Sequence, residues 1–168
     1  MQTNALPHYD DSHNTTGCCP RFNPGGWDGQ ELHFKDKKFV HATTRNAMHI
    51  PLNMGSVFGR VQGRIEDAGA YDPDNMLVLS RELSPWKAEH LFAVDTDIAG
   101  EEMVTLSGDF LTKVFEGPYS SVKDWQADME RAVRETGKAP KDIYFFYTTC
   151  PKCAKAYGQN FVVGVARV

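Results

Sequence analysis

Two segments of the chain share one hydrophobic pattern, in which apolar residues recur at spacings of three and four. In the first segment the apolar positions are Met54, Phe58, Val61, Ile65 and Ala68. In the second they are Val122, Trp125, Met129 and Val133. This spacing gathers apolar side chains on one face of a helix. We therefore expect two amphipathic helices, ended by Gly69 and Gly137.

Segments rich in β-branched and aromatic residues surround each predicted helix and indicate strands. Around the first helix they are residues 38–44, 75–80 and 89–94. Around the second helix they are residues 105–115, 142–147 and 159–166. In each half the last two segments are predicted to form a hairpin.

The order of elements is therefore strand, helix, strand, strand, and it occurs twice. A constant offset of 68 residues places Met54 on Val122 and Gly69 on Gly137. We predict an α+β fold with a tandem repeat, about 39–98 and 103–168. The two units form one antiparallel sheet with both helices on one face, and a groove follows the pseudo-twofold axis.

Residues 1–37 are polar and carry no sustained periodicity, so they are predicted to be an irregular N-terminal arm. Only Cys18, Cys19, Phe22 and Trp27 are suited to anchor it. With 168 residues, of which 41% are hydrophobic, the chain is long enough for one domain with its own core. That domain is expected to span residues 38–168.

The charge of the chain limits the classes of molecule that are expected to bind it. The net charge is −4, the pI is near 5.8, and the sequence has no run of Lys or Arg. Nucleic acids and anionic membranes are therefore not expected as partners. The N-terminal residues lack the pattern of a secretory signal, so a cytoplasmic location is expected. There thiols stay reduced, which favours metal or redox chemistry over structural disulfides for the four cysteines.

The strongest chemical motif is Cys150-Pro151-Lys152-Cys153, because two thiols at this spacing can bind one metal ion. Cys18 and Cys19 are the expected partners, although neighbouring side chains diverge and only one of the two is expected to ligate. His8, His13 and His33 are alternative ligands. The predicted ion is zinc, in a structural rather than a catalytic site that would hold the arm.

Two other interpretations of the cysteines stay open. One is a redox-active dithiol, but the motif is predicted to lie in a hairpin loop, without the strand-to-helix setting of thioredoxin-like sites. The other is a set of inert thiols. The sequence itself does not separate a closed structural zinc site from an open catalytic one.

The run Phe115-Glu116-Gly117-Pro118-Tyr119 carries a family resemblance, together with the following helix, its glycine stop and the terminal hairpin. These features resemble the second half of the gyrase-inhibitor-like (GyrI-like) small-molecule-binding domain of bacteria, over residues 38–168. The resemblance implies a tandem strand-helix-strand-strand fold, a small-molecule ligand and, in stand-alone members, hydrolysis of reactive xenobiotics. Because the chain has no recognisable helix-turn-helix segment, a transcription-factor role is not expected.

Candidate site residues follow from the predicted groove. The ligand-binding candidates are Trp86, Tyr144 and Phe146, and alternation places Tyr144 and Phe146 on one face of the sheet with Phe145 and Tyr147 on the other. The resemblance favours acidic groove residues, for which Glu89 and Glu116 are the candidate bases. Tyr119 and Tyr147 are the candidate donors, with His49 and His90 as alternative bases. Each ring can equally pack in the core, and each glutamate can be a solvated charge.

Three classes of function follow. The first is a hydrolase that acts on a small or xenobiotic ligand, in which a carboxylate activates water and a tyrosine hydroxyl stabilises the leaving group. The alternative is a non-catalytic module that senses or sequesters a small molecule and carries a structural zinc site. A protein partner such as gyrase is the third. The sequence has none of the motifs of serine hydrolases, zinc proteases or P-loop enzymes.

Overall fold

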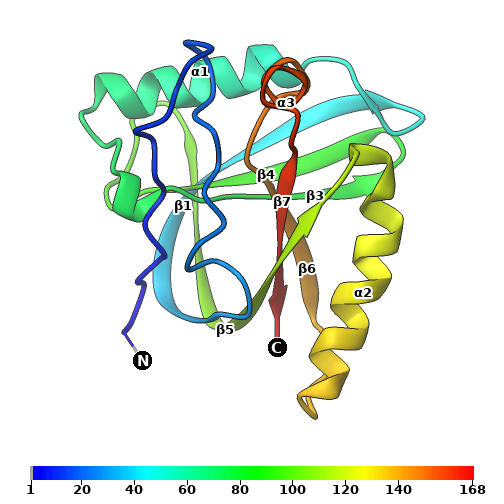
Figure 1. Cartoon of the computed structure of the whole chain (residues 1–168). Helices are drawn as coiled ribbons and strands as arrows, with labels where there is room; N and C mark the ends of the chain where they lie inside the picture. Colours follow the sequence, from blue (N-terminus) through cyan, green and yellow to red (C-terminus); the bar gives the residue numbers. More distant parts are fainter. Residues whose placement is uncertain (1) are drawn as a thin grey trace.

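Six strands of a seven-stranded antiparallel sheet close into a barrel, and the remaining two-residue strand pairs at one end of it (Figure 1). This computed structural model describes residues 2–168. The strands are β1 (Glu31–Ala47), β2 (Ile50–Pro51), β3 (Val78–Ser84), β4 (Lys87–Ala93), β5 (Glu102–Glu116), β6 (Asp142–Tyr147) and β7 (Phe161–Arg167). Their order is β2-β1-β4-β3-β6-β7-β5, and β5 also pairs with β1. The predicted α+β class and single antiparallel sheet are confirmed.

Closure of the sheet was not predicted, and it depends on the length of β1 and β5. β1 pairs with β4 through Phe39–Arg45 and with β5 through Glu31–His41, whereas the sequence predicted a strand over 38–44 only. A bulge between Phe34 and Lys37 bends β1, and Asp36 has a φ of 49° there. Such a bulge increases local twist, which helps a long strand to reach two neighbours.

Three α-helices accompany the barrel: α1 (Met54–Asp67), α2 (Val122–Glu135) and α3 (Pro151–Tyr157). The first two match the predicted helices. α1 buries Val57, Val61 and Ile65, and α2 buries Trp125, Met129 and Val133. Figure 1 shows α1 across the top of the barrel and α2 along its side. Within residues 2–168, none of the helices combines the length and apolar character needed to cross a bilayer.

The third helix corrects the sequence analysis, which placed Cys150 to Cys153 in a hairpin loop. Cys150 has extended backbone and precedes α3, Pro151 occupies its first turn, and Gly158 ends it in the left-handed conformation. Proline suits the first helical position because its missing N–H has no partner there. The cysteine pair therefore lies between a strand and a helix, with β6 before it and α3 after it.

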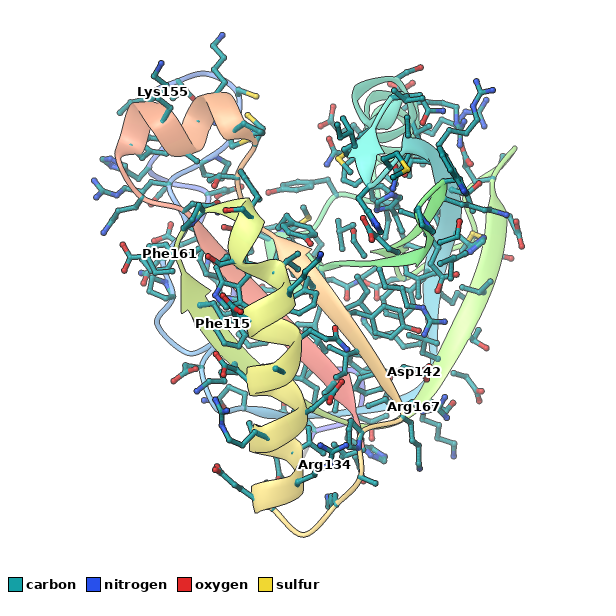
Figure 2. The ribbon with its side chains drawn as sticks, turned by 90° about the vertical axis from the view of Figure 1, so that its right-hand side faces the viewer. Phe115, Arg134, Asp142, Lys155, Phe161 and Arg167 are labelled. Atoms are coloured by element: carbon teal, nitrogen blue, oxygen red, sulfur yellow. The ribbon has the colours of Figure 1, made fainter. Side chains whose placement is uncertain are left out.

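Alternation along the strands divides the core in two. Phe115, Phe145 and Val162 pack against Trp125 and Met129 of α2. Figure 2 shows Phe115 beside α2, with Asp142 and Arg167 together at the far end of β6 and β7. The opposite side chains of the same strands belong to the larger cluster: Tyr144, Phe146, Val163 and Val165.

The N-terminal arm, although irregular, contributes to that larger cluster. Tyr9, Phe22 and Trp27 are buried, and their rings lie 6.1, 6.3 and 5.6 Å from the ring of Phe146. The arm runs along the barrel toward α3 (Figure 1). It therefore brings Cys18 and Cys19 to the end of β6.

Candidate functional site

Four cysteines from the two ends of the chain form one cluster. The Sγ atoms of Cys18, Cys19, Cys150 and Cys153 all lie within 4.8 Å of one another, and those of Cys18 and Cys19 are 3.8 Å apart. All four thiols are free. Figure 2 shows sulfur atoms beside α3, the helix that carries Lys155. The predicted meeting of the arm with the Cys-x-x-Cys motif is confirmed.

Hydrogen bonds tie the arm to α3 around the sulfurs. The Thr16 hydroxyl lies 3.2 Å from the Sγ of Cys153, and the backbone N–H of Cys150 points to the Sγ of Cys19 at 3.5 Å. The Tyr157 hydroxyl donates to the carbonyl oxygen of Cys19 at 2.6 Å. These contacts fix the path of both cysteine-bearing segments.

Cys18 and Cys19 both enter the cluster, although only one was expected to do so. The turn at Gly17, which has a φ of 72°, precedes them in the chain. Two of the alternative histidine ligands are engaged elsewhere: His8 contacts Asp74 and His33 contacts Asp109, each at 2.6 Å. The cluster contains cysteine only.

The surroundings of Cys153 favour a thiolate at that residue. Burial opposes the charged form of Cys153, but hydrogen bonds from Thr16 and the neighbouring thiols outweigh it and lower the pKa of Cys153 to about 6. Burial raises the pKa of the Cys19 thiol. Because the pair also has the strand-to-helix setting, the sequence argument against a redox dithiol is wrong. The two additional cysteines favour a metal over a dithiol.

The predicted ligand-binding residues do not share one surface. Phe146 is buried among the arm rings, and Tyr144 lies under the guanidinium of Arg81, 4.8 Å from its ring centre. Trp86, in the turn between β3 and β4, is 57% exposed.

Glu89 takes part in a network of charged groups around Arg81. Its carboxylate accepts from Nε of Arg81 at 2.6 Å and lies 3.2 Å from Nε2 of His41. Arg81 also contacts Asp142, and His41 also contacts Glu102. These contacts balance the charge of Glu89. Glu116, at the end of β5, is exposed.

Tyr119 and Tyr147, the two alternative candidate donors, lie beside each other. Their ring centres are 5.9 Å apart. The Tyr119 hydroxyl donates to the backbone oxygen of Thr149, next to Cys150. Tyr147 is 37% exposed, and burial of its hydroxyl, followed by the charge of Glu82, raises the pKa of Tyr147 to about 12. Both phenols are therefore protonated at neutral pH.

A histidine–carboxylate pair lies where the turn between β1 and β2 meets the last residues of β3. Nδ1 of His49 is 2.6 Å from Oε2 of Glu82, and about half of each side chain is exposed. The backbone N–H of His49 donates to the oxygen of Pro85 at 2.9 Å, which joins this turn to the turn between β3 and β4. His49 was a candidate base, whereas Glu82 was missed because no local pattern shows that the turn at His49 meets the end of β3.

Exposed apolar side chains lie close to this pair in the sequence, within residues 48–52 and 83–86. We call them the apolar tip: Met48, Ile50, Leu52, Leu83 and Trp86. An exposed apolar group of this kind usually marks a contact surface. His90, the other candidate base, is buried with Ser80 at 2.7 Å and Thr44 at 2.9 Å, so both ring nitrogens already have partners.

Comparison with curated proteins gives no match. SAV2435, in a structure bound to tetraphenylphosphonium, is similar with 12% identity and a TM-score of 0.46, covering 84% of this chain and 93% of that chain. A protein described as a candidate for transcription regulation from Staphylococcus aureus MU50 has 14% identity and a TM-score of 0.43, covering 85% and 100%. A model of the bacterial hydrolase family matches residues 9–168, and the chain therefore belongs to that family.

Proposed function

We propose that the protein hydrolyses small apolar electrophiles at the His49–Glu82 pair. The observation that carries this proposal is the 2.6 Å contact between Nδ1 of His49 and the Glu82 carboxylate, between the exposed side chains of the apolar tip. The family of the chain supports the reaction class. The ligand is a small molecule that rests on the apolar tip.

The pair has the geometry of an oriented general base. The carboxylate of Glu82 accepts the Nδ1–H of His49, so Nε2 carries the free lone pair. Within residues 2–168, no hydrogen bond engages that nitrogen. Nε2 takes a proton from water as its oxygen attacks the electrophilic carbon, and the proton then passes to the leaving group. Tyr147, protonated and partly exposed, donates to the developing anion.

The apolar tip sets the class of substrate. Its five side chains offer dispersion contacts and no charge, so they favour a neutral substrate with an alkyl or aryl group. Trp86 is the largest of them and presents an indole face. An ester or a strained-ring compound with such a group meets both requirements.

The proposal also includes predictions from the sequence about individual residues, the metal ion and the repeat. We retain Tyr119, Tyr147 and Trp86 as site residues, and Glu89 and Glu116 as the alternative bases to be tested. A zinc ion at the four cysteines, membership of the GyrI-like group, a cytoplasmic location and a duplicated unit over 39–98 and 103–168 are also retained as proposals. A sensor that binds the same ligand without turnover is the second candidate function.

The decisive experiment compares two histidine–carboxylate pairs. His33 and Asp109 match His49 and Glu82 in distance, 2.6 Å, and in exposure, but lie outside the apolar tip. Against nitrophenyl esters and epoxides, His49→Asn and Glu82→Gln should each lower kcat/KM, His49→Asn by about 100-fold, because the base is lost. His33→Asn should stay within about twofold.

Several outcomes would contradict the proposal. Equal losses in the His49 and His33 variants would indicate a general effect on the fold. A loss in Glu89→Gln or Glu116→Gln, with His49→Asn unchanged, would move the base to that glutamate. If the native protein binds apolar esters, detected through Trp86 fluorescence, but turns none over, the function is sensing or sequestration.

A further inference from the structure

We propose that Cys18, Cys19, Cys150 and Cys153 bind one zinc ion, and that this ion holds Tyr119 and Tyr147 in position. The first part concerns a metal site and is independent of the reaction. The second part rests on the hydrolase function proposed above, because it assigns the metal centre a role in placing a hydroxyl donor.

The spacing of the sulfurs fits a tetrahedral metal. A zinc ion with four Zn–S bonds of about 2.3 Å requires sulfurs about 3.8 Å apart. The Sγ atoms of Cys18 and Cys19 have that separation, 3.8 Å, and all four atoms lie within 4.8 Å of one another. Small side-chain rotations are therefore enough to close the coordination sphere.

The donor set favours zinc and a closed site. Four thiolates are typical ligands of structural zinc, and they leave no position for water or substrate. The cluster also has outer partners: the Thr16 hydroxyl beside the Sγ of Cys153, and the N–H of Cys150 beside the Sγ of Cys19. Such donors orient ligands and offset the negative charge of a tetrathiolate centre. The ion is structural, and no step of hydrolysis passes through it.

The centre joins two parts of the chain that are far apart in the sequence. Cys18 and Cys19 lie in the irregular arm, and Cys150 and Cys153 flank the start of α3. Binding energy of a structural zinc ion is folding energy when the ligands are far apart in the chain. The ion would therefore fix the arm against the end of β6.

The same segment of chain holds the two tyrosines. Tyr147 ends β6, Thr148 and Thr149 follow it, and Cys150 is the next residue. The oxygen of Thr149 accepts the hydrogen bond from the Tyr119 hydroxyl. A metal at Cys150 therefore fixes the acceptor that positions Tyr119, whose ring lies 5.9 Å from that of Tyr147.

A second set of hydrogen bonds connects Thr149 with the backbone that precedes Tyr119. The Thr149 hydroxyl donates to the side-chain oxygen of Asn160 at 3.2 Å, and the side-chain amide of Asn160 donates to the oxygen of Gly117 at 2.8 Å. Gly117 lies two residues before Tyr119, at the turn into α2. One hydrogen-bond network therefore holds both Gly117, which precedes Tyr119, and Thr149, whose oxygen accepts from the Tyr119 hydroxyl. This network begins at Thr149, the residue before the metal ligand Cys150.

The metal part is tested by composition. Protein purified under reducing conditions without chelator should contain one zinc per chain by elemental analysis. Cobalt should replace it with the absorption of a tetrahedral thiolate site. His8→Asn and His33→Asn, which alter the alternative histidine ligands, should keep the full metal content, as should Tyr119→Phe. Less than about a tenth of an equivalent, even after zinc is added, would overturn the site.

The positioning part is tested with the full chain labelled with 3-fluorotyrosine, so that no variant needs to fold without its cysteines. Fluorine NMR signals are assigned with Tyr119→Phe and Tyr147→Phe. Removing zinc with a chelator should move or broaden the Tyr119 and Tyr147 signals, and adding zinc back should restore them. The Tyr144 signal, from the ring under Arg81, should stay unchanged as the control.

The two proposals fail in different ways. If zinc leaves and the Tyr119 signal does not change, the positioning role is wrong, whether or not the protein is a hydrolase. If the signal changes but the protein never turns over a substrate, the hydrolase proposal fails and the metal-dependent position of Tyr119 stands. When both hold, zinc removal should lower kcat by about 10-fold or more, and zinc should restore it.

Discussion

Trp27→Ala is expected to lower the free energy of unfolding by about 3–5 kcal/mol, although the residue lies in the irregular arm. Trp27 is fully buried, and its ring lies 5.8 Å from Phe22 and 5.6 Å from Phe146. Its indole N–H also donates to the oxygen of His8 at 3.3 Å. Alanine would leave a cavity that the surrounding barrel strands can fill only in part. Urea unfolding followed by circular dichroism measures the difference.

The matched control is the same substitution at Trp86, which is 57% exposed in the turn between β3 and β4. Trp86→Ala should change the free energy of unfolding by less than about 0.5 kcal/mol, because little buried surface is lost. If both variants lose the same amount, or if Trp27→Ala is as stable as the native chain, the arm does not belong to the core.

The sequence supports the regular elements because their signals are local. Both helices follow from apolar spacing, and Gly69 and Gly137 mark their ends with φ values of 64° and 83°. Alternation along β6 correctly separates Tyr144 from Tyr147, since neighbouring side chains of a strand point to opposite faces. Such features need no knowledge of distant contacts.

Features that depend on distant contacts were missed. The extension of β1 back to Glu31 depends on β5, which supplies partners as far as Leu111. The contact between His49 and Glu82 exists because the turn after β1 meets the end of β3, and neither segment carries a motif that predicts this contact. The cysteine cluster is the exception, because the metal-binding chemistry of thiols and the Cys-x-x-Cys spacing predict which residues meet without a contact pattern.

The stability of the protein is expected to fall as the pH is lowered from about 6.5 toward 4, and His90 is the main identified cause. Burial lowers the pKa of His90 to about 4, whereas an exposed histidine titrates near 6.5. The ring also has short contacts with Ser80 and Thr44 and an edge contact with Phe58, so the fold holds it neutral. Nearby Glu89 opposes the shift and His41 adds to it, but desolvation is the largest cause.

The sign follows from proton binding. Because the pKa of His90 is lower in the folded state, the unfolded chain binds the additional proton below pH 6.5, and stability is lost there. The loss is about 2 kcal/mol at pH 5 and about 3 kcal/mol at pH 4, relative to pH 7.5. His90→Gln cannot titrate but keeps a hydrogen-bonding side chain. Urea unfolding of both proteins at pH 7.5 and 5 measures this loss. The free energy of unfolding should fall by about 2 kcal/mol less in the variant, because the two proteins share all other titrating groups. Equal losses in the two proteins would show that His90 takes up its proton in the folded state, which its burial against Phe58 and its two hydroxyl partners argues against.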